Sequence, residues 1–426
     1  MLTTLQGRSI SRGLIPNAQP WATGYIGLLV FLALFRKAQH SAFLQTTNGY
    51  FVVCAIVFAT MAVIDLAVHR VHRQPDVGQL TFRFSRDRLN LPVLGQKMAG
   101  LAVSAAIAQA LYTGLPIYRD SWFAAVFDSA RPAIVIFLVG LLIYVILFHF
   151  WRPIPKDSLS NFGQFALTLG ATGNREEVKS YLLGLMIKTF FLPLMIGFGG
   201  QDWGRLTAVE FQQGGFRSIY EFLYQFWLLI DVSFAVIGYS CSFRLLNAHL
   251  RWPEMSIGGW VICLICYAPF WQLINRNYIS YSDEIVWGTL FPQDSAGYVV
   301  WGALILLLMG TYALSTVSFG YRFSNLTYRG VVTHGPYRVF RHPAYTCKNI
   351  AYWMIELPMF GASPATAMMN CLGLVAVNAI YFTRARYEEA CCAKHEDYAA
   401  YMDTPLFHRV IKRFNSKRPF EIGPEI

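Results

Sequence analysis

Residues 131–151 read RPAIVIFLVGLLIYVILFHFW, an apolar run interrupted by a single Arg at its start. A helix needs about 20 predominantly apolar residues to cross the hydrocarbon core of a bilayer. This stretch has that length and that composition. It is therefore predicted to be a membrane-spanning helix, and the rest of the chain is read outward from it.

The whole chain shares this character. It has 426 residues, of which 55% are hydrophobic and 14% charged, and its mean hydropathy is +0.39. Soluble globular domains carry about 25% charged residues. Aromatic residues make up 16% of the chain, and Tyr and Trp favour membrane–water interfaces. The composition therefore excludes an ordinary soluble protein and favours an integral membrane protein.

Further apolar runs flank the opening stretch on both sides. They predict an all-α, polytopic bundle of about ten transmembrane helices, of which the first and the ninth are short. The predicted spans are residues 21–35, 49–68, 98–117, 131–151, 180–198, 219–240, 256–274, 297–319, 347–361 and 365–382. Residues 361–364, Gly-Ala-Ser-Pro, are a turn signal, so the last two spans are expected to form a helical hairpin.

The basic residues alternate between the loops that these spans define. Of the 35 Lys and Arg residues, 27 lie in the terminal segments and in every second loop, seven lie in the other loops, and Lys188 lies within a span. Cytoplasmic loops carry the excess of basic residues. Both termini are therefore expected in the cytoplasm. The same rule accounts for the net charge of +11, so no nucleic-acid partner is expected.

The eight cysteines predict no metal site. Most lie within or beside apolar runs, where Cys packs as a small hydrophobe. Cys263 and Cys266 are three residues apart, but no second Cys or His pair completes the tetrahedral set that structural zinc requires.

The densest group of chemically capable residues is 328–349, YRGVVTHGPYRVFRHPAYTCKN. Gly335 and Pro336 indicate a turn, and Pro343 is suited to the first turn of a following helix. The free N–H groups of such a helix end suit a carboxylate or phosphate, and Arg341 adds bidentate capacity for the same group. The positive-inside rule alone would explain the arginines, but not two His, two Pro and a Gly among them.

A second group, NAIYFTRARYEE, occupies residues 378–389 at the end of the last span. Arg384 and Glu388 are four residues apart, on one face of a helix, and Glu389 follows. A hairpin would bring this group to the first one, at the cytoplasmic edge of the membrane. Paired carboxylates beside a cation often have shifted pKa values at functional sites, although a solvated ion-pair face is an equal interpretation.

Together these groups resemble the isoprenylcysteine carboxyl methyltransferase and phospholipid methyltransferase superfamily over roughly residues 297–412. The carrying motifs are Gly-Pro-Tyr-Arg at 335–338, Arg-His-Pro-Ala-Tyr at 341–345, Arg384 with the Glu pair at 388–389, and Tyr398 with Tyr401. Two departures are Cys347, where the family often has Gly, and Lys394-His395, where it often has Phe-Gly.

The resemblance implies a methyltransferase that uses S-adenosylmethionine and takes a lipophilic, isoprenylcysteine-like or lipid-borne acceptor from the bilayer. Its expected membrane is a bacterial inner membrane or one of endoplasmic-reticulum type, with the site facing the cytoplasm. It divides the chain into residues 1–296, of unassigned role, and a methyltransferase-like module at 297–426. It assigns catalysis to Arg384 and Glu389, and cofactor binding to His334, Gly335, Pro336, Tyr337, Arg341, His342, Pro343, Tyr345 and Glu388.

Two alternatives remain open. A sterol or enone reductase that uses NADPH carries a similar Arg-His-Pro-x-Tyr motif, and a transporter or scaffold could retain the module without its activity. Among ionisable residues in the earlier spans, Asp231 lies at the centre of one and could act in acceptor binding or pair with Lys188. Asp65, His149 and Glu221 lie near span ends, from which a side chain can reach the interface.

Overall fold

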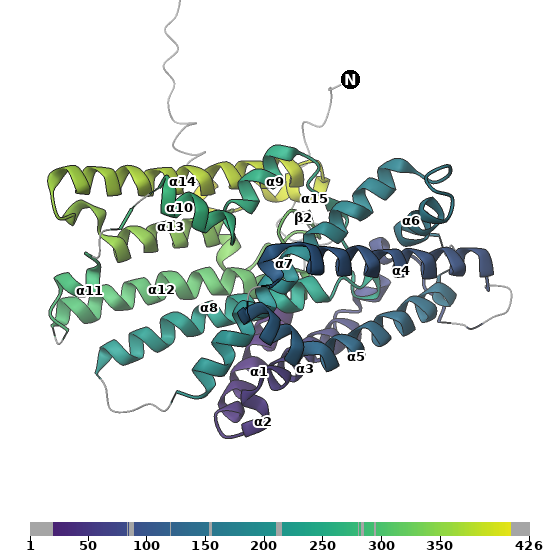
Figure 1. The fold of residues 1–426 in the computed structure, drawn as a ribbon, viewed down its shortest axis with the longest axis horizontal. Helices are drawn as coiled ribbons and strands as arrows, with labels where there is room; N and C mark the ends of the chain where they lie inside the picture. Colours follow the sequence, from purple (N-terminus) through teal and green to yellow (C-terminus); the bar gives the residue numbers. More distant parts are fainter. Residues whose placement is uncertain are drawn as a thin grey trace, which may run out of the picture.

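A computed structural model describes residues 20–82, 84, 89–119, 121–152, 156–209, 215–279, 281–282, 285–293 and 295–409. Within these ranges the chain is mostly helical, at 76%, and the strands that pair are two residues long (Figure 1). This confirms the predicted all-α class. The terminal segments 1–19 and 410–426, on which the predicted orientation partly depends, lie outside the described residues.

The α-helices are α1 (Ala22–Ala38), α2 (Ala42–Gln45), α3 (Thr47–Ala67), α4 (Leu91–Gly114), α5 (Ser121–Trp151), α6 (Ser158–Leu167), α7 (Arg175–Thr207), α8 (Phe216–Ser240), α9 (Ile257–Leu264), α10 (Phe270–Asn277), α11 (Trp287–Leu290), α12 (Ala296–Phe319), α13 (Pro343–Glu356), α14 (Pro364–Cys392) and α15 (Glu396–Tyr401). Short 3-10 turns are η1 (Val71–Arg73), η2 (Pro75–Val77), η4 (Pro116–Arg119), η5 (Arg244–Leu246), η6 (Gly320–Arg322), η7 (Gly335–Arg338) and η8 (Pro358–Phe360). Strands β1 (Trp252–Pro253) and β2 (Thr327–Tyr328) pair antiparallel, with Trp252 opposite Tyr328.

Seven of the described helices are long and apolar enough to cross a membrane: α3, α4, α5, α7, α8, α12 and α14. Each corresponds to one of the ten predicted spans. The predicted first span is α1, which has 17 residues, and the predicted ninth span is α13 with η8, of which α13 has 14 residues. Both fall short of the length that crosses a bilayer without help from their flanks.

The predicted seventh span, residues 256–274, is wrong as a continuous helix. Ser256 caps α9 by accepting a hydrogen bond from the Gly259 N–H, but the helix ends at Leu264 and α10 begins only after Pro269. Proline has no N–H to donate and disfavours helical geometry in the residue before it. Hydropathy averaged over a window does not register this break.

The expected helical hairpin of α13 and α14 is present. Pro343 stands in the first turn of α13, and Pro364 in the first turn of α14. The Ser363 hydroxyl caps α14 by accepting a hydrogen bond from the Thr366 N–H, which satisfies one of the free donors of a helix start. The two helices pack against each other.

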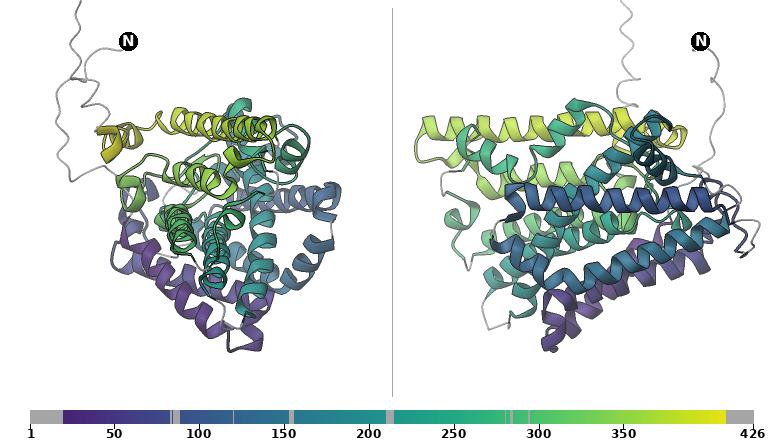
Figure 2. Two further views of the ribbon diagram at one scale, coloured as in Figure 1. Left: turned by 90° about the vertical axis from the view of Figure 1, so that its left-hand side faces the viewer. Right: turned by 45° about the vertical axis from the view of Figure 1, so that its right-hand side comes forward.

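Helix α12 lies between α8 and the hairpin of α13 and α14. In Figure 1, α14, α13, α12 and α8 lie one below another, and α12 packs against both α13 and α8. The right-hand view of Figure 2 brings α4 and α5 to the front, where α4 packs against α6. The largest apolar core joins α1, α3, α7, α8 and α12 around Trp203, Tyr50 and Phe234, which are fully or almost fully buried.

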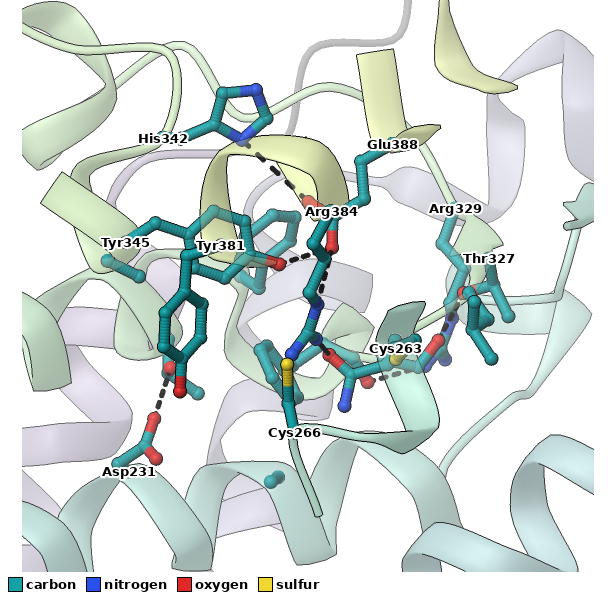
Figure 3. A pocket seen from close by; sticks show the side chains of 18 of the residues that line it. Asp231, Cys263, Cys266, Thr327, Arg329, His342, Tyr345, Tyr381, Arg384 and Glu388 are labelled. Carbon is teal, nitrogen blue, oxygen red and sulfur yellow. Dashed lines mark hydrogen bonds and ion pairs between the residues drawn. The ribbon is translucent and has the colours of Figure 1, made fainter. Parts of the chain in front are cut away.

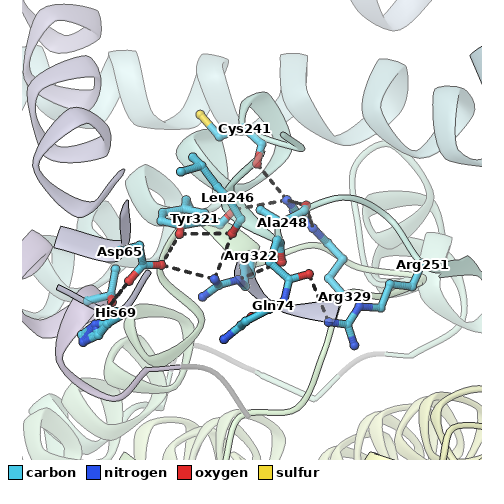
Figure 4. Close-up of polar contacts among 12 residues, drawn as sticks. Asp65, His69, Gln74, Cys241, Leu246, Ala248, Arg251, Tyr321, Arg322 and Arg329 are labelled. Carbon is cyan, nitrogen blue, oxygen red and sulfur yellow. Dashed lines mark hydrogen bonds and ion pairs between the residues drawn. The ribbon is translucent and has the colours of Figure 1, made fainter. Parts of the chain in front are cut away.

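A buried polar network anchors the end of α12 (Figure 4). Asp65 of α3 is fully buried and accepts hydrogen bonds from Thr23, Tyr321 and Arg322, the last at 3.2 Å. Arg329 donates to backbone carbonyls of the chain before and after α12, including Gly238 at 2.7 Å. A buried charge is stable only when it is paired in this way.

Two predictions about ionisable residues near span ends are therefore wrong. Neither Asp65 nor His149 reaches the interface, since both side chains are fully buried. Glu221 is exposed and pairs with Arg217 at 2.7 Å.

Candidate functional site

A cavity of about 550 Å³ lies between α8, α9, α12, the hairpin of α13 and α14, and α15 (Figure 3). Its volume is within the range of small-molecule sites, about 300–1,000 Å³. Apolar side chains such as Phe198, Leu228 and Val232 form part of its wall, and ionisable side chains of α13 and α14 form another part. The cavity can therefore hold a ligand that is polar at one end and apolar elsewhere.

The turn at residues 334–338 borders the cavity through one side chain, that of Tyr337. His334 faces the other way: its ring packs edge-on against Tyr25, and its Nε2 lies 3.2 Å from the Ser318 carbonyl oxygen. Burial lowers the pKa of His334 to about 4, so the ring is neutral at neutral pH and Nε2 carries the hydrogen. Its role here is to join the turn to α1 and α12.

Gly335 is required by the backbone of this turn. Its φ is +58°, in the left-handed region, and a Cβ atom built there would lie 2.0 Å from the Tyr25 hydroxyl oxygen. Pro336 follows in the first turn of η7. These residues shape the loop rather than line the cavity.

Arg341 and His342 lie at the start of α13 and border the cavity. The Arg341 Nε donates to the Met402 carbonyl oxygen at 2.7 Å, and its Nη1 lies 3.2 Å from Glu389 Oε1. In the described part of the chain, Nη2 of Arg341 has no hydrogen-bond partner. His342 Nε2 lies 3.2 Å from the same Glu389 oxygen. Arg341 and His342 thus join the segment before α13 to α14. Arg341 also joins it to the segment after α15.

Arg384 is held between two aromatic faces, with Tyr345 at 5.1 Å and Tyr267 at 5.4 Å. Such contacts stabilise a cation, more so when it is removed from water. Its Nη2 donates to the Asn325 side chain at 2.7 Å, and its Nε lies 3.5 Å from Glu388 Oε1. The Tyr345 hydroxyl donates to the same Glu388 oxygen. Arg384 is therefore fixed in place beside a carboxylate.

The structure brings together six of the predicted site residues around the cavity: Tyr337, Arg341, His342, Tyr345, Arg384 and Glu388. The other five lie outside its lining: His334, Gly335, Pro336, Pro343 and Glu389. Pro343 begins α13 and is buried. Glu389 contacts Arg341, His342 and Arg386, the last at 3.4 Å, so its contacts hold the loop against α14.

Sequence reasoning missed several residues of the cavity. Tyr267 comes from the break between α9 and α10, and Asn325 from the loop after α12; neither belongs to a recognisable motif. Lys348 lies one turn after Tyr345, but no motif in the sequence singles it out. The suggested pair of Lys188 with Asp231 is wrong, because Asp231 accepts hydrogen bonds from Tyr312 and Thr316 instead.

The segment around α15 covers part of the cavity. Tyr398 and Tyr401 both line it, and the Tyr401 hydroxyl donates to the Tyr337 carbonyl oxygen at 2.8 Å. His395, at one of the departures from the family pattern, stacks on Tyr328 with ring centroids 4.0 Å apart.

Protein-family models, curated protein sequences and solved structures were each compared with this chain, and none of them matches it. The family resemblance consequently depends on the motif residues and on how they are placed.

Proposed function

We propose that this protein is a multi-pass membrane methyltransferase, which transfers the methyl group of S-adenosylmethionine to a lipophilic acceptor. The observation that carries the proposal is the meeting of two motif segments, 341–345 and 384–388, in one cavity that also has apolar walls from α7 and α8. A polar donor and an apolar acceptor need both kinds of surface in one place. In this proposal the site faces the cytoplasm and the acceptor enters from the bilayer.

The residues present fit S-adenosylmethionine. The Nη2 of Arg341, which has no hydrogen-bond partner among the described residues, can take the carboxylate of the methionine part. Glu388 Oε2, which has His342 Nδ1 as a neighbour at 3.7 Å, can accept from an amine or ribose hydroxyl. The aromatic ring of Tyr337 offers a face to a sulfonium cation. When bound, the donor would supply a methyl group and become a neutral thioether.

The chain's own contribution would be positioning. Arg384 is held rigidly by Tyr267, Tyr345 and Asn325, and it can orient an electron-rich acceptor group toward the methyl carbon. Alignment of this kind supplies a large part of the rate gain in reactions between two bound molecules. Glu389 acts one step away, by holding Arg341 and His342.

The test is a binding titration on the purified protein in lipid nanodiscs, with S-adenosylmethionine and with NADPH. Saturable binding of S-adenosylmethionine is expected, weakened about tenfold or more in Glu388→Gln, because a hydrogen bond to a charged group is lost. Glu221→Gln is the matched control, since Glu221 is an exposed carboxylate that does not line the cavity. Saturable NADPH binding without S-adenosylmethionine binding would favour the reductase instead.

Activity is tested by adding methyl-labelled S-adenosylmethionine to membranes that contain the protein, together with lipid extract. Label should appear in a lipid or a lipidated product, and it should disappear in Arg384→Met. A protein that binds S-adenosylmethionine but never labels any product would contradict the acceptor half of the proposal.

A further inference from the structure

Lys348 lies in the cavity beyond Tyr345, and its surroundings are unusual. The Nζ atom lies over three tyrosine rings, 5.6 Å from the centroid of Tyr312, 5.7 Å from that of Tyr352 and 5.3 Å from that of Tyr381. These rings come from α12, α13 and α14 respectively, so three helices build one aromatic cage around an ammonium group. Lys348, Tyr312 and Tyr381 all line the cavity.

The tyrosine rings of the cage are neutral, and Asp231 attracts this ammonium group only from a greater distance. In the part of the chain that the structure describes, no carboxylate oxygen lies within 4.0 Å of Lys348 Nζ. Asp231 of α8 also lines the cavity, and Figure 3 shows it at the opposite end of the pocket from His342 and Glu388. Its oxygens accept hydrogen bonds from the Tyr312 hydroxyl, at 2.6 Å, and from Thr316. Asp231 is therefore satisfied by hydroxyl groups.

An ammonium group in this position is energetically costly. Removing a charge from water is costly even after the surroundings relax, and cation–π contacts recover only part of that cost. The ammonium has three N–H donors and faces a cavity whose walls include apolar residues of α7 and α8. An acidic group in the cavity would complete the site with charge-assisted hydrogen bonds.

We propose that Lys348 and its three tyrosines form an anion-binding subsite, which takes the acid group of a lipophilic ligand whose apolar chain lies along α7 and α8. The subsite depends on the cavity and does not depend on the proposed methyl transfer. If that function holds, the subsite selects acceptors that carry an acid group over neutral or amine lipids.

The experiment measures binding of four probes with the same apolar chain to the protein in nanodiscs, without S-adenosylmethionine. The probes are palmitate, hexadecyl phosphate, hexadecanol and hexadecylamine. Palmitate or hexadecyl phosphate is expected to bind about tenfold or more tightly than hexadecanol, as expected for a hydrogen bond to a charged group. Whichever of the two acids binds more tightly shows whether the subsite prefers a carboxylate or a phosphate.

Two variants make the test specific. Lys348→Met keeps an unbranched side chain, one atom shorter, and removes the charge, so it should abolish the preference for the acids while hexadecanol binding changes by less than about twofold. Lys348→Arg keeps the charge and should retain most of the preference. A buried charge without a close ion-pair partner carries a desolvation cost that an apolar side chain does not, so Lys348→Met is expected to unfold at the same temperature or higher.

Equal binding of acids and hexadecanol by the native protein would overturn the subsite, as would an equal loss of both in Lys348→Met. Either result leaves the binding of S-adenosylmethionine untouched, so failure of the subsite and failure of the methyltransferase proposal are distinguished.

Discussion

Gly335 does not line the cavity, but its backbone conformation and its packing strongly constrain which residue can stand at this position. Its positive φ disfavours any residue with a side chain. In addition, a Cβ atom would collide with the Tyr25 hydroxyl. The turn that it forms carries Tyr337 to the cavity and leads into Arg341 and His342, which directly precede α13. The motif glycine therefore acts through the backbone.

Gly335→Ala should destabilise the protein by about 2 kcal/mol or more. A left-handed backbone costs about 1–2 kcal/mol for a residue with Cβ, and overpacking costs about 1–3 kcal/mol. Thermal unfolding in detergent, followed by tryptophan fluorescence, measures the effect. The control is Gly95→Ala in α4, where a Cβ meets no other atom and the helix should gain up to about 1 kcal/mol. Equal stability of the two variants would contradict the assigned role of Gly335.

The two neighbouring glutamates have different surroundings, which their adjacency in the sequence does not reveal. Glu388 borders the cavity, whereas Glu389 contacts Arg341 and His342. Consecutive residues of a helix point about 100° apart, so the two side chains meet different surroundings, although both lie near His342. The geometry gives Glu388 the greater access to a ligand and gives Glu389 a positioning role.

Among the elements, the short helix α15 reaches the cavity through Tyr398 and Tyr401. It is six residues long. It is held by the Tyr401 hydroxyl on the Tyr337 carbonyl, by Arg341 on the Met402 carbonyl, and by Arg251, which lies 3.5 Å from Asp397. A short element with few bonds opens more readily than the helices beneath it.

Tyr401→Phe should therefore raise the rate of amide hydrogen exchange in α15 about fivefold, because a hydrogen bond of this kind contributes about 1 kcal/mol. Tyr398→Phe is the matched control on the same helix, since the Tyr398 hydroxyl has no hydrogen-bond partner among the described residues. Exchange in α12 should not change in either variant. Equal effects of the two substitutions would indicate that the Tyr337 contact does not hold α15.

For the whole molecule, the distribution of basic residues predicts that both termini and the loop containing His334 share the cytoplasmic side. Green fluorescent protein fused after residue 426 should then fluoresce in a bacterial host, because it folds in the cytoplasm. Alkaline phosphatase fused after residue 208, between α7 and α8, should be active, and phosphatase fused after 426 should be inactive. The reverse pattern would contradict both the orientation and the proposed access of a cytosolic donor.

The sequence alone determined the features that depend on local composition. Seven of ten predicted spans correspond to helices long and apolar enough to cross a membrane, and the turn before Pro364 predicted the hairpin. Local composition failed at residues 256–274, because a window average does not register a helix that ends before Pro269. The two motif segments were likewise readable in the sequence, together with six of the residues that border the cavity.

Only the tertiary structure decided which residues meet. Arg384 is held by Tyr267 and Asn325, from segments more than 50 positions away, and the cage of Lys348 needs one tyrosine from each of three helices. Asp231 takes hydroxyl partners instead of Lys188 for the same reason. Hydropathy and residue spacing determine the secondary structure of a segment. The partner of a side chain is set instead by the rotation and packing of helices distant in sequence. The anion subsite is consequently a property of the packed hairpin and not of any one motif.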